Sequence, residues 1–316
     1  MGKKPIIVLT GPTAAGKSAL GISLAKKING QIISADAMQI YRGMDIGSAK
    51  ATQAEREEIR HHMLDVADPT EAYSVARFVA EAGACIEQVF AMGAQPIVVG
   101  GTGLYIDRLL DGQNFAHLPQ NDGLRTRLAE EYDTLGGQVM WENLSKVDEA
   151  SAKILHPNDK RRIVRALEVY ELTGLSIRTQ NADISEPPYR SLYIALTAKH
   201  REALYARIDQ RVDLMLAEGL LDEVKQLVEQ GVRREHTAMQ GIGYKELLAV
   251  LSGETDMETA VEKMKQESRR YAKRQLSWIR RRADVNWLTW EEKPDDAYLL
   301  TQALGLWETF SGEERV

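Results

Sequence analysis

The chain has 316 residues, about the size at which one hydrophobic core stops growing, so we expect two domains or one domain with a substantial insertion. Apolar residues make up 44% and charged residues 27%, which excludes a disordered, collagen-like or low-complexity protein. The formal net charge of −6 gives no average preference for nucleic acid, and the single cysteine, Cys85, excludes an intramolecular disulfide and a multi-cysteine zinc site.

The first elements predict a parallel sheet. Residues 5–10 form a short buried strand that ends at a Gly-rich turn, and the leucine spacing of residues 17–28 predicts a helix. Residues 31–35 predict a second strand, which ends at Asp36. A strand, a helix and a strand within about thirty residues are typical of a βαβ unit. We see neither a signal peptide nor an apolar run long enough to span a membrane, and we expect a cytoplasmic protein.

Further along the chain, helix and strand signals continue to alternate. Thr52 and Glu55 have the spacing of a capping box and open a short predicted helix. Ser74 is the predicted N-cap of a longer amphipathic helix that ends at Gly93. Residues 96–99 predict another buried strand, which closes on Gly100-Gly101-Thr102-Gly103.

The character of the sequence changes at about Asn114, where strand signals stop and helical stretches take over. We predict an α/β fold with a P-loop-type parallel sheet core flanked by helices, interrupted by an all-helical insertion domain over residues 115–189. The catalytic core then comprises residues 1–114 and 190–316. Its second part carries a strand at 191–196, long helices at roughly 200–230 and 256–282, and a last strand near 285–289.

Residues 11–18 carry a strong chemical signal, since they fit the pattern G-x-x-x-x-G-K-[ST] between a predicted strand and a predicted helix. The glycines let successive backbone N–H groups converge on phosphate oxygens, helped by the N-terminus of the following helix. Lys17 supplies a positive charge, and the Ser18 hydroxyl is a candidate ligand for Mg²⁺. The predicted phosphate- or nucleotide-binding loop is Gly11, Pro12, Thr13, Ala14, Ala15, Gly16, Lys17 and Ser18.

The loop alone leaves the phosphate compound open. The absence of an N-K-x-D motif from the sequence argues against a GTPase, and the strand at 97–99 ends in glycine where motor-type ATPases carry an acid for magnesium. The nearest acid at a strand end is Asp36. It either faces the crevice in which open α/β sheets bind ligands or fixes a loop.

Basic residues are clustered although the protein is acidic. Residues 269–282 contain seven arginines or lysines and no acid, and a second cluster comprises Lys160, Arg161, Arg162 and Arg165. Such clusters are either a footprint for a polyanion or solvated helix faces, and the pattern itself does not decide between them.

The motifs together resemble the tRNA dimethylallyltransferases, the tRNA isopentenyltransferases of bacterial type. The resemblance covers essentially residues 5–282 in the order of that family. It departs at Ala15, Ser18 and Ala37, where the family has Ser, Thr and Ser, and at Ile279, where Phe is common. Besides the phosphate loop, the matching segments are 34–47, 61–65, 99–105, 156–168, 241–246 and 272–278.

The resemblance implies transfer of a dimethylallyl group from dimethylallyl diphosphate to N6 of the adenosine 3′ of the anticodon, with release of diphosphate. It implies that Asp36 takes the proton of the attacking amine, that Thr13 contacts the bridging oxygen and that Arg211 contacts the diphosphate. A diphosphate gripped by Lys17, with Mg²⁺ at Ser18, needs no ATP chemistry. The adenosine has to leave the stack of the anticodon loop, so base flipping is expected.

The partners that the resemblance implies are the anticodon stem-loop of tRNA and dimethylallyl diphosphate, bound by a monomer with no membrane contact. Arg270, Lys273, Arg274 and Arg281 are spaced to lie on one side of a helix, and we expect phosphate contacts from some of them. The implied tRNA-binding residues are Asp36, Ala37, Met38, Gln39, Thr102, Arg125, Arg161, Arg162, Arg165, Gln240, Gly241, Ile242, Gly243, Tyr244, Lys245, Lys273 and Arg274.

Two other functions stay open at this point. A small-molecule kinase would use ATP at the same loop, with the helical insertion as a lid, and a non-catalytic RNA-binding protein would keep the loop as a remnant. Intact Thr13, Lys17 and Asp36 argue against decay of the site.

Three residue types have structural interpretations that we prefer. The pair His61-His62 lacks a third ligand at metal-site spacing, which favours hydrogen bonding. Cys85 lies near the apolar face of its helix and is expected to be inert. Trp278 is expected to pack the last long helix.

Overall fold

The computed structural model describes residues 3–112, 121–180 and 186–312. The chain divides into two compact units, one formed by Met1–Leu110 with Pro188–Val316 and the other by Asp111–Pro187. The first unit contains the sheet and the phosphate loop, and the second is the inserted segment, for which the sequence predicted residues 115–189.

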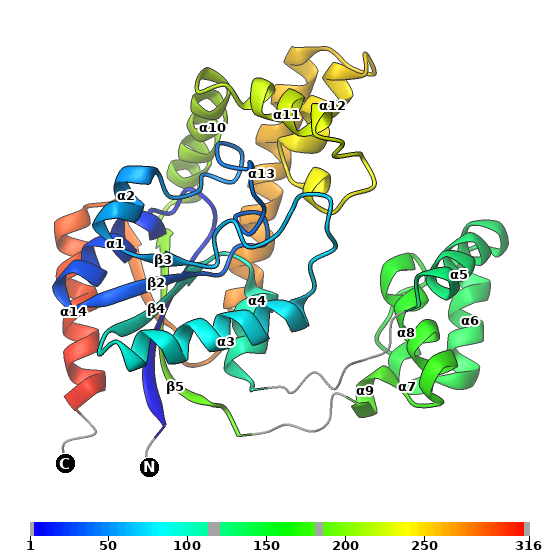
Figure 1. The fold of residues 1–316 in the computed structure, drawn as a ribbon, viewed down its shortest axis with the longest axis horizontal. Coiled ribbons are helices and arrows are strands. Elements are labelled where there is room, and N and C mark those ends of the chain that lie inside the picture. Colours follow the sequence, from blue (N-terminus) through cyan, green and yellow to red (C-terminus); the bar gives the residue numbers. More distant parts are fainter. Residues whose placement is uncertain (1–2, 113–120, 181–185, 313–316) are drawn as a thin grey trace. The chain divides into compact units, whose positions relative to one another are not determined.

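The core of the first unit is a six-stranded parallel sheet in the order β3-β2-β4-β1-β5-β6 (Figure 1). This confirms the predicted α/β fold. The central strand β1 pairs with β4 and β5, with Ile7 opposite Ile97 and Leu192. The strands are β1 (Lys4–Thr10), β2 (Gly30–Ser34), β3 (His61–His62), β4 (Gln95–Gly100), β5 (Tyr189–Ala198) and β6 (Asn286–Trp290).

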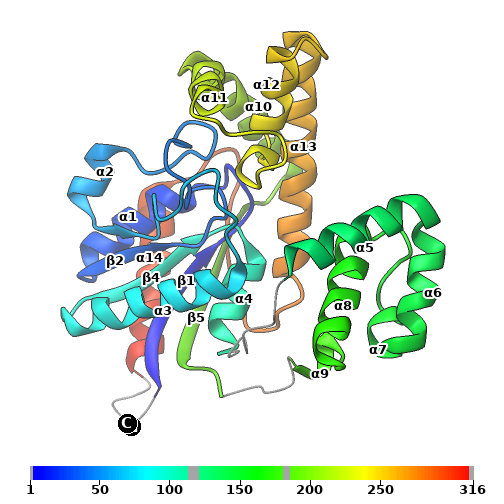
Figure 2. The same cartoon turned by 45° about the vertical axis from the view of Figure 1, so that its right-hand side comes forward.

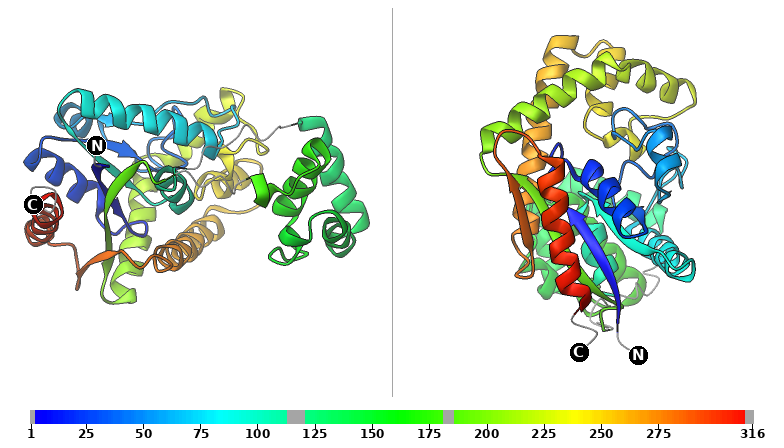
Figure 3. Two further views of the ribbon diagram at one scale, coloured as in Figure 1. Left: turned by 90° about the horizontal axis from the view of Figure 1, so that it is seen from below. Right: turned by 90° about the vertical axis from the view of Figure 1, so that its left-hand side faces the viewer.

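Helices cover both faces of the sheet, which is why β1 is a continuous apolar run. Ile7 and Leu9 face a core built with α1 (Lys17–Lys27), α10 (Arg201–Ala217) and α14 (Asp296–Gly312). Ile6 and Val8 point to the opposite face, and their core includes side chains of α3 (Val75–Ala91) and α4 (Gly103–Leu110). Figure 2 shows α3 and α4 together, and Figure 3 shows α1 beside α14.

The predicted helix starts are confirmed. Thr52 and Glu55 form the capping box of α2 (Gln53–Glu58), and the Ser74 hydroxyl accepts a hydrogen bond from the Arg77 N–H at the start of α3. Each cap satisfies backbone N–H groups that have no partner within the helix.

The region 200–230 differs from the prediction of one long helix. It contains α10 and a separate α11 (Leu220–Glu229), because Gly219 adopts φ 99° and the chain turns there. A short 3₁₀ turn η1 (Ala238–Gln240) and α12 (Tyr244–Leu251) follow, before the long α13 (Met257–Ile279). Side chains from α10 to α13 pack on residues 38–73 in an apolar cluster above the sheet (Figure 1).

Helices α4, α12 and α14 were not predicted. Apolar side chains on several sides of α14 pack against the core, so its sequence lacks a clear period; they include Leu299, Leu300, Leu304, Leu306 and Trp307. None of the helices in the described part of the chain combines the length and apolar character that crossing a membrane requires.

The inserted unit has its own small core. Leu128, Met140, Leu144, Ile163 and Leu167 pack together, and the described residues 121–180 contain helices and no strand. Its helices are α5 (Asp122–Leu135), α6 (Gly137–Val147), α7 (Glu149–Ala152), α8 (Lys160–Thr173) and α9 (Ile177–Gln180).

Candidate active site

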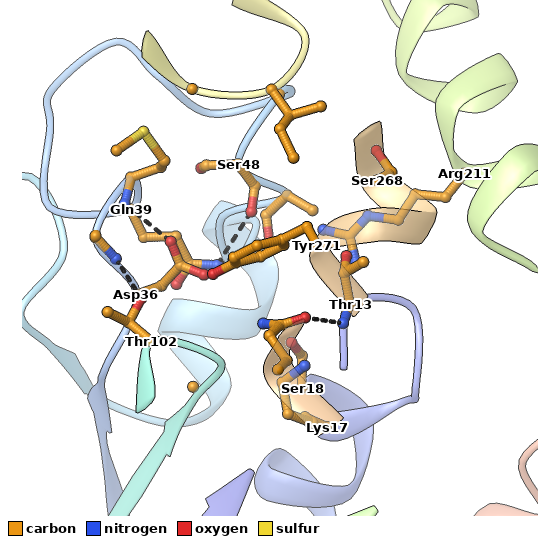
Figure 4. Close-up of a pocket in the computed structure, with 18 of the residues that line it drawn as sticks. Thr13, Lys17, Ser18, Asp36, Gln39, Ser48, Thr102, Arg211, Ser268 and Tyr271 are labelled. Atoms are coloured by element: carbon orange, nitrogen blue, oxygen red, sulfur yellow. Dashed lines mark hydrogen bonds between the residues drawn. The ribbon is translucent and has the colours of Figure 1, made fainter. Parts of the chain in front are cut away.

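A cavity of 440 Å³ lies at the carboxyl end of the sheet, where open α/β folds bind ligands. The phosphate loop, the segment after β2, the end of β4, α10 and α13 all contribute to its wall. Figure 4 shows two groups of side chains on opposite sides of it. Asp36, Gln39, Ser48 and Thr102 form one, and Thr13 and Arg211 belong to the other.

The phosphate loop has the backbone conformation that its glycines predict. Gly11 adopts φ 148°, and a Cβ there would lie 2.2 Å from the Leu196 carbonyl oxygen, so only glycine fits. The loop carbonyls are held from outside the motif: Arg207 Nε donates to the Ala14 oxygen at 3.1 Å, and Trp290 Nε1 donates to the Ala15 oxygen at 3.0 Å. Neither Arg207 nor Trp290 was predicted from the sequence as a support of the loop.

Gln275 of α13 connects the phosphate loop to the end of β4. Its Oε1 accepts a hydrogen bond from the Thr13 backbone N–H at 2.9 Å, and its Nε2 donates to the Gly101 carbonyl at 2.9 Å. The side chain is buried, and a Cβ at Gly101 would lie 2.2 Å from its Nε2. Gln275 lies within a matched sequence segment, but it was not predicted as a site residue.

Two cations face the cavity beside the loop. The Lys17 Nζ donates to the Pro12 carbonyl at 2.8 Å. Burial and, to a smaller extent, the charge of Arg211 lower the pKa of Lys17 to about 8, although Asp36 acts in the opposite direction. Burial also lowers the pKa of Arg211, while Asp36 raises it. Concentrated positive charge with little water around it is a site for an anion.

Asp36 follows β2 and lines the cavity. Its Oδ1 accepts a hydrogen bond from the Met38 N–H at 2.9 Å, and the Thr102 hydroxyl accepts one from the Ala37 N–H at 3.0 Å. The carboxylate therefore fixes the turn in which it stands and also faces the cavity. The two interpretations of Asp36 are compatible.

Tyr271 lies between the two groups of side chains (Figure 4). Burial raises the pKa of its phenol, the Asp36 charge raises it further, and hydrogen bonds to Thr102 and Gln275 act in the opposite direction. A sequence signal existed for this face of α13, because four of its cavity-lining residues follow a helical spacing of four, three and four: Met264, Ser268, Tyr271 and Gln275.

The predicted tRNA-binding residues of the first unit and the basic residues near them differ in their surroundings. Nine line the cavity with Asp36: Ala37, Met38, Gln39, Thr102, Gln240, Gly241, Ile242, Lys245 and Arg274. The exposed basic side chains of α13 include Arg270, Lys273 and Arg274, whereas Arg281 is exposed in the turn that follows the helix. Tyr244 is a correction, since its side chain is completely buried and its hydroxyl donates to Glu223 at 2.6 Å. Gly243 is the residue before α12 and adopts φ 96°.

The predicted arginines of the inserted unit are also of two kinds. Arg161 and Arg162 are exposed on α8. Arg125 and Arg165 instead pair with the fully buried carboxylate of Glu168, at 2.9 and 2.8 Å.

The other singled-out residues have structural partners. His61 hydrogen-bonds the Ile59 carbonyl at 2.7 Å, and His62 hydrogen-bonds Gln31 at 2.8 Å. Trp278 donates to Asp107 at 2.6 Å and packs α13 against Gly103 of α4. Cys85 packs against the α3 side of the core, where burial raises the pKa of its thiol.

A metal at this site would have few protein ligands. No group of three or more His, Cys, Asp and Glu side chains gathers among the residues that the structure describes. Ser18 lines the cavity at the start of α1 and offers one hydroxyl oxygen. This donor set suits Mg²⁺, which keeps several waters and takes its other ligands from phosphate oxygens.

Comparisons with known proteins identify the family of the chain. The family model described as IPP transferase matches residues 39–282, and the one described as Isopentenyl transferase matches residues 4–71. A tRNA dimethylallyltransferase of Pelotomaculum thermopropionicum is 46% identical over 294 residues, covering 93% of each chain. That of Symbiobacterium thermophilum is 48% identical over 287 residues, covering 90% of this chain and 89% of its own.

Two solved structures extend the likeness to three dimensions. The tRNA isopentenylpyrophosphate transferase of Bacillus halodurans is 39% identical, with a TM-score of 0.73 and complete coverage of both chains. A eukaryotic dimethylallyltransferase acting on tRNA is 34% identical, with a TM-score of 0.76, and the match covers 99% of this chain and 77% of that one.

Proposed function

This chain belongs to the IPP transferase family, the tRNA dimethylallyltransferases, and from that premise we propose how its residues carry out the reaction. The chain is a prenyl-group transferase that modifies tRNA by dimethylallyl transfer. The acceptor atom that we assign is N6 of the adenosine 3′ of the anticodon.

The diphosphate of the donor binds between the phosphate loop and Arg211. As the bond between the allylic carbon and the bridging oxygen breaks, negative charge builds up on that oxygen. Lys17 and Arg211 stabilise this charge, and the Thr13 hydroxyl lies in the loop where it can donate to the bridging oxygen. The guanidinium of Arg211 suits two phosphate oxygens because it offers a planar pair of donors.

Ser18 is the residue that we assign to Mg²⁺. When bound, the ion supplies positive charge that neutralises the diphosphate oxygens. The protein would contribute one ligand to the ion, the hydroxyl oxygen of Ser18 in the phosphate loop.

Asp36 activates the acceptor. The exocyclic amine of adenine is a weak nucleophile, because its lone pair is delocalised into the ring. A carboxylate within hydrogen-bonding reach takes the amine proton as the N6–carbon bond forms and diphosphate leaves. The adenosine enters the cavity flipped out of the anticodon loop, beside Gln39 and Thr102.

We assign tRNA binding to Gln240, Lys245 and Arg274 of the cavity wall and to the exposed basic side chains of α13. In the inserted unit we assign it to the exposed side chains of Arg161 and Arg162. We propose that the enzyme acts as a monomer. Because tRNA is the substrate, we place the enzyme in the cytoplasm.

The observation that carries this proposal is the cavity itself, in which Lys17 and Arg211 lie across from Asp36. The test is an incubation of the enzyme with Mg²⁺, dimethylallyl diphosphate and an unmodified tRNA that has adenosines 3′ of its anticodon. Mass spectrometry of the nucleosides is expected to show a dimethylallyl adduct on adenosine.

The variants for this test are Asp36→Asn and, as a matched control, Asp296→Asn at the exposed start of α14. We expect loss of the adduct in the first and wild-type yield in the second. An adduct that persists with Asp36→Asn would show that Asp36 is not the base. Turnover of ATP with a phosphate acceptor, without use of the allylic diphosphate, would establish the kinase alternative instead.

A further inference from the structure

Glu223 of α11 is a buried carboxylate that receives four hydrogen bonds from neutral donors. Its Oε2 accepts from the backbone N–H groups of Asp45 and Ile46 at 2.8 and 2.7 Å. Its Oε1 accepts from the Gly47 N–H at 3.2 Å and from the Tyr244 hydroxyl at 2.6 Å. Burying an ionised carboxylate is costly unless its oxygens are paired in this way, so the group holds three consecutive residues of one loop.

Tyr244 completes this attachment from α12. Its ring lies so close to Gly47 that a Cβ there would be 2.6 Å from the ring atoms, and its side chain has no solvent exposure. Burial, together with the charge of Glu223, raises the pKa of Tyr244 well above its usual value, so the hydroxyl remains a donor.

Carbonyl groups of the loop that Glu223 holds contact Gln39, a residue of the cavity wall. Gln39 Nε2 donates to the Ser48 and Ala49 oxygens, each at 3.2 Å, and Gln39 Oε1 accepts from the Ser34 hydroxyl at 2.7 Å. Gln39 lines the cavity on the same side as Asp36 (Figure 4). The orientation of its amide therefore depends on the loop, and the loop depends on Glu223.

The phosphate loop is held by a different set of side chains, namely Arg207, Trp290 and Gln275. Neither Glu223 nor Tyr244 is one of these side chains, so disturbing the loop that they hold need not disturb the phosphate loop.

We propose that Glu223 and Tyr244 are positioning residues for the tRNA acceptor, which hold the loop Asp45–Ala49 so that Gln39 is correctly oriented beside Asp36. This inference rests on the proposed function and specifies which substrate the two residues serve. Neither residue touches a substrate, and both act through the loop.

The test is steady-state kinetics with tRNA and dimethylallyl diphosphate varied separately. In Glu223→Gln, the amide places N–H donors where the loop N–H groups need an acceptor, and we expect the KM for tRNA to rise about tenfold. We expect the KM for dimethylallyl diphosphate to stay within about twofold of wild type. Tyr244→Phe keeps the ring on Gly47 and removes one donor, so its effect on tRNA is expected to be about threefold.

The double variant and a packing control separate positioning from loss of stability. Because both side chains act on one loop, Glu223→Gln with Tyr244→Phe is expected to fall short of the product of the single effects. Val224→Ala loosens the same apolar cluster but keeps the hydrogen bonds of Glu223 and Tyr244, and we expect no selective rise of the KM for tRNA. Amide hydrogen exchange of residues 45–49 is expected to accelerate in Glu223→Gln and Tyr244→Phe but not in Val224→Ala.

An equal rise of both KM values, an unchanged KM for tRNA, or a selective tRNA effect of Val224→Ala would each overturn the inference while leaving the proposed function intact. If Glu223→Gln fails to fold, Tyr244→Phe decides alone. A wild-type enzyme that leaves tRNA unmodified overturns the proposed function and this inference with it.

Discussion

The Gln275 side chain accepts a hydrogen bond from the Thr13 backbone N–H at 2.9 Å, across 262 positions of the chain. Through its other end it donates to the Gly101 carbonyl at 2.9 Å, and Thr102, the next residue, accepts from the Ala37 N–H at 3.0 Å. The buried amide of Gln275 therefore fixes the phosphate loop relative to the end of β4 and, through Thr102, relative to the turn that carries Asp36.

Replacing Gln275 by leucine is expected to impair both stability and catalysis. The Thr13 N–H and the Gly101 oxygen would be left buried without partners, at a cost of about 1–3 kcal/mol in the free energy of unfolding. Because the phosphate loop then loses its position, kcat should fall as well. Denaturant unfolding and steady-state kinetics measure the two effects.

The matched control is Gln226→Leu, which removes an exposed glutamine of α11. We expect wild-type kinetics and a change in stability of less than about 0.5 kcal/mol there. If Gln275→Leu shows the same kinetics as Gln226→Leu, the bridging role of Gln275 is wrong.

The lowered pKa of Lys17 predicts that the binding of dimethylallyl diphosphate depends on pH. Its pKa of about 8 in the free enzyme lies below the ordinary lysine value of 10.5, so the charge is present below about pH 8 and is lost as the pH rises through it. A bound diphosphate stabilises the protonated amine and raises its pKa. Binding near pH 8.5 should therefore take up a proton, and the Kd for dimethylallyl diphosphate should rise above pH 8. Calorimetry in two buffers of different ionisation enthalpy measures the uptake.

The same lowered pKa has the opposite effect on folding. Between about pH 8 and 10.5 the unfolded chain binds the proton more tightly than the folded protein does, so the contribution of Lys17 to stability becomes more favourable as the pH rises.

Lys17→Met should abolish the proton uptake that accompanies diphosphate binding. Uptake that persists in this variant would assign the titration to another group.

The sequence predicted those parts of the fold and site that depend on local patterns. The apolar run of β1, the phosphate loop and the capping box at Thr52 are each contained within a short segment, so their residue types are sufficient. The fold class followed, because a strand, a helix and a strand in succession restrict the topology.

The missed site residues depend on contacts between distant segments. Tyr271 and Gln275 point into the cavity because α13 turns this face inward, which the basic residues of the same helix do not reveal. Tyr244 was expected at a tRNA surface, but the close approach of Gly47 buries it. The break at Gly219 was missed because a single glycine within an amphipathic pattern does not require the left-handed conformation.

Two glycines give opposite predictions for substitution by alanine. At Gly11 a methyl group would lie 2.2 Å from the Leu196 carbonyl oxygen, and we expect a loss of about 1–3 kcal/mol with loss of diphosphate binding. At Gly305, within α14, a methyl group meets no described atom within 4 Å. Gly305→Ala should stabilise the protein by about 0.5–1 kcal/mol and leave activity unchanged. Thermal unfolding distinguishes the two, and destabilisation by Gly305→Ala would contradict the second prediction.

The arginines of the inserted unit are expected to separate into binding and structural groups. Arg161 and Arg162 are exposed, so Arg161→Ala and Arg162→Ala should each weaken tRNA binding and lower the slope of log K against log salt by about 1, without loss of stability. Binding titrations at several salt concentrations give the slope.

Arg125→Ala and Arg165→Ala should behave differently, because each leaves the buried Glu168 with one cation fewer. We expect a loss of about 1–3 kcal/mol in the stability of the inserted unit. In the double variant with Glu168→Gln this loss should be smaller than the sum of the single effects, since the carboxylate that needs the cation is gone. Additive losses would show that these two arginines are not held by Glu168. A reduced salt slope with unchanged stability would place them with Arg161 and Arg162 on the tRNA surface.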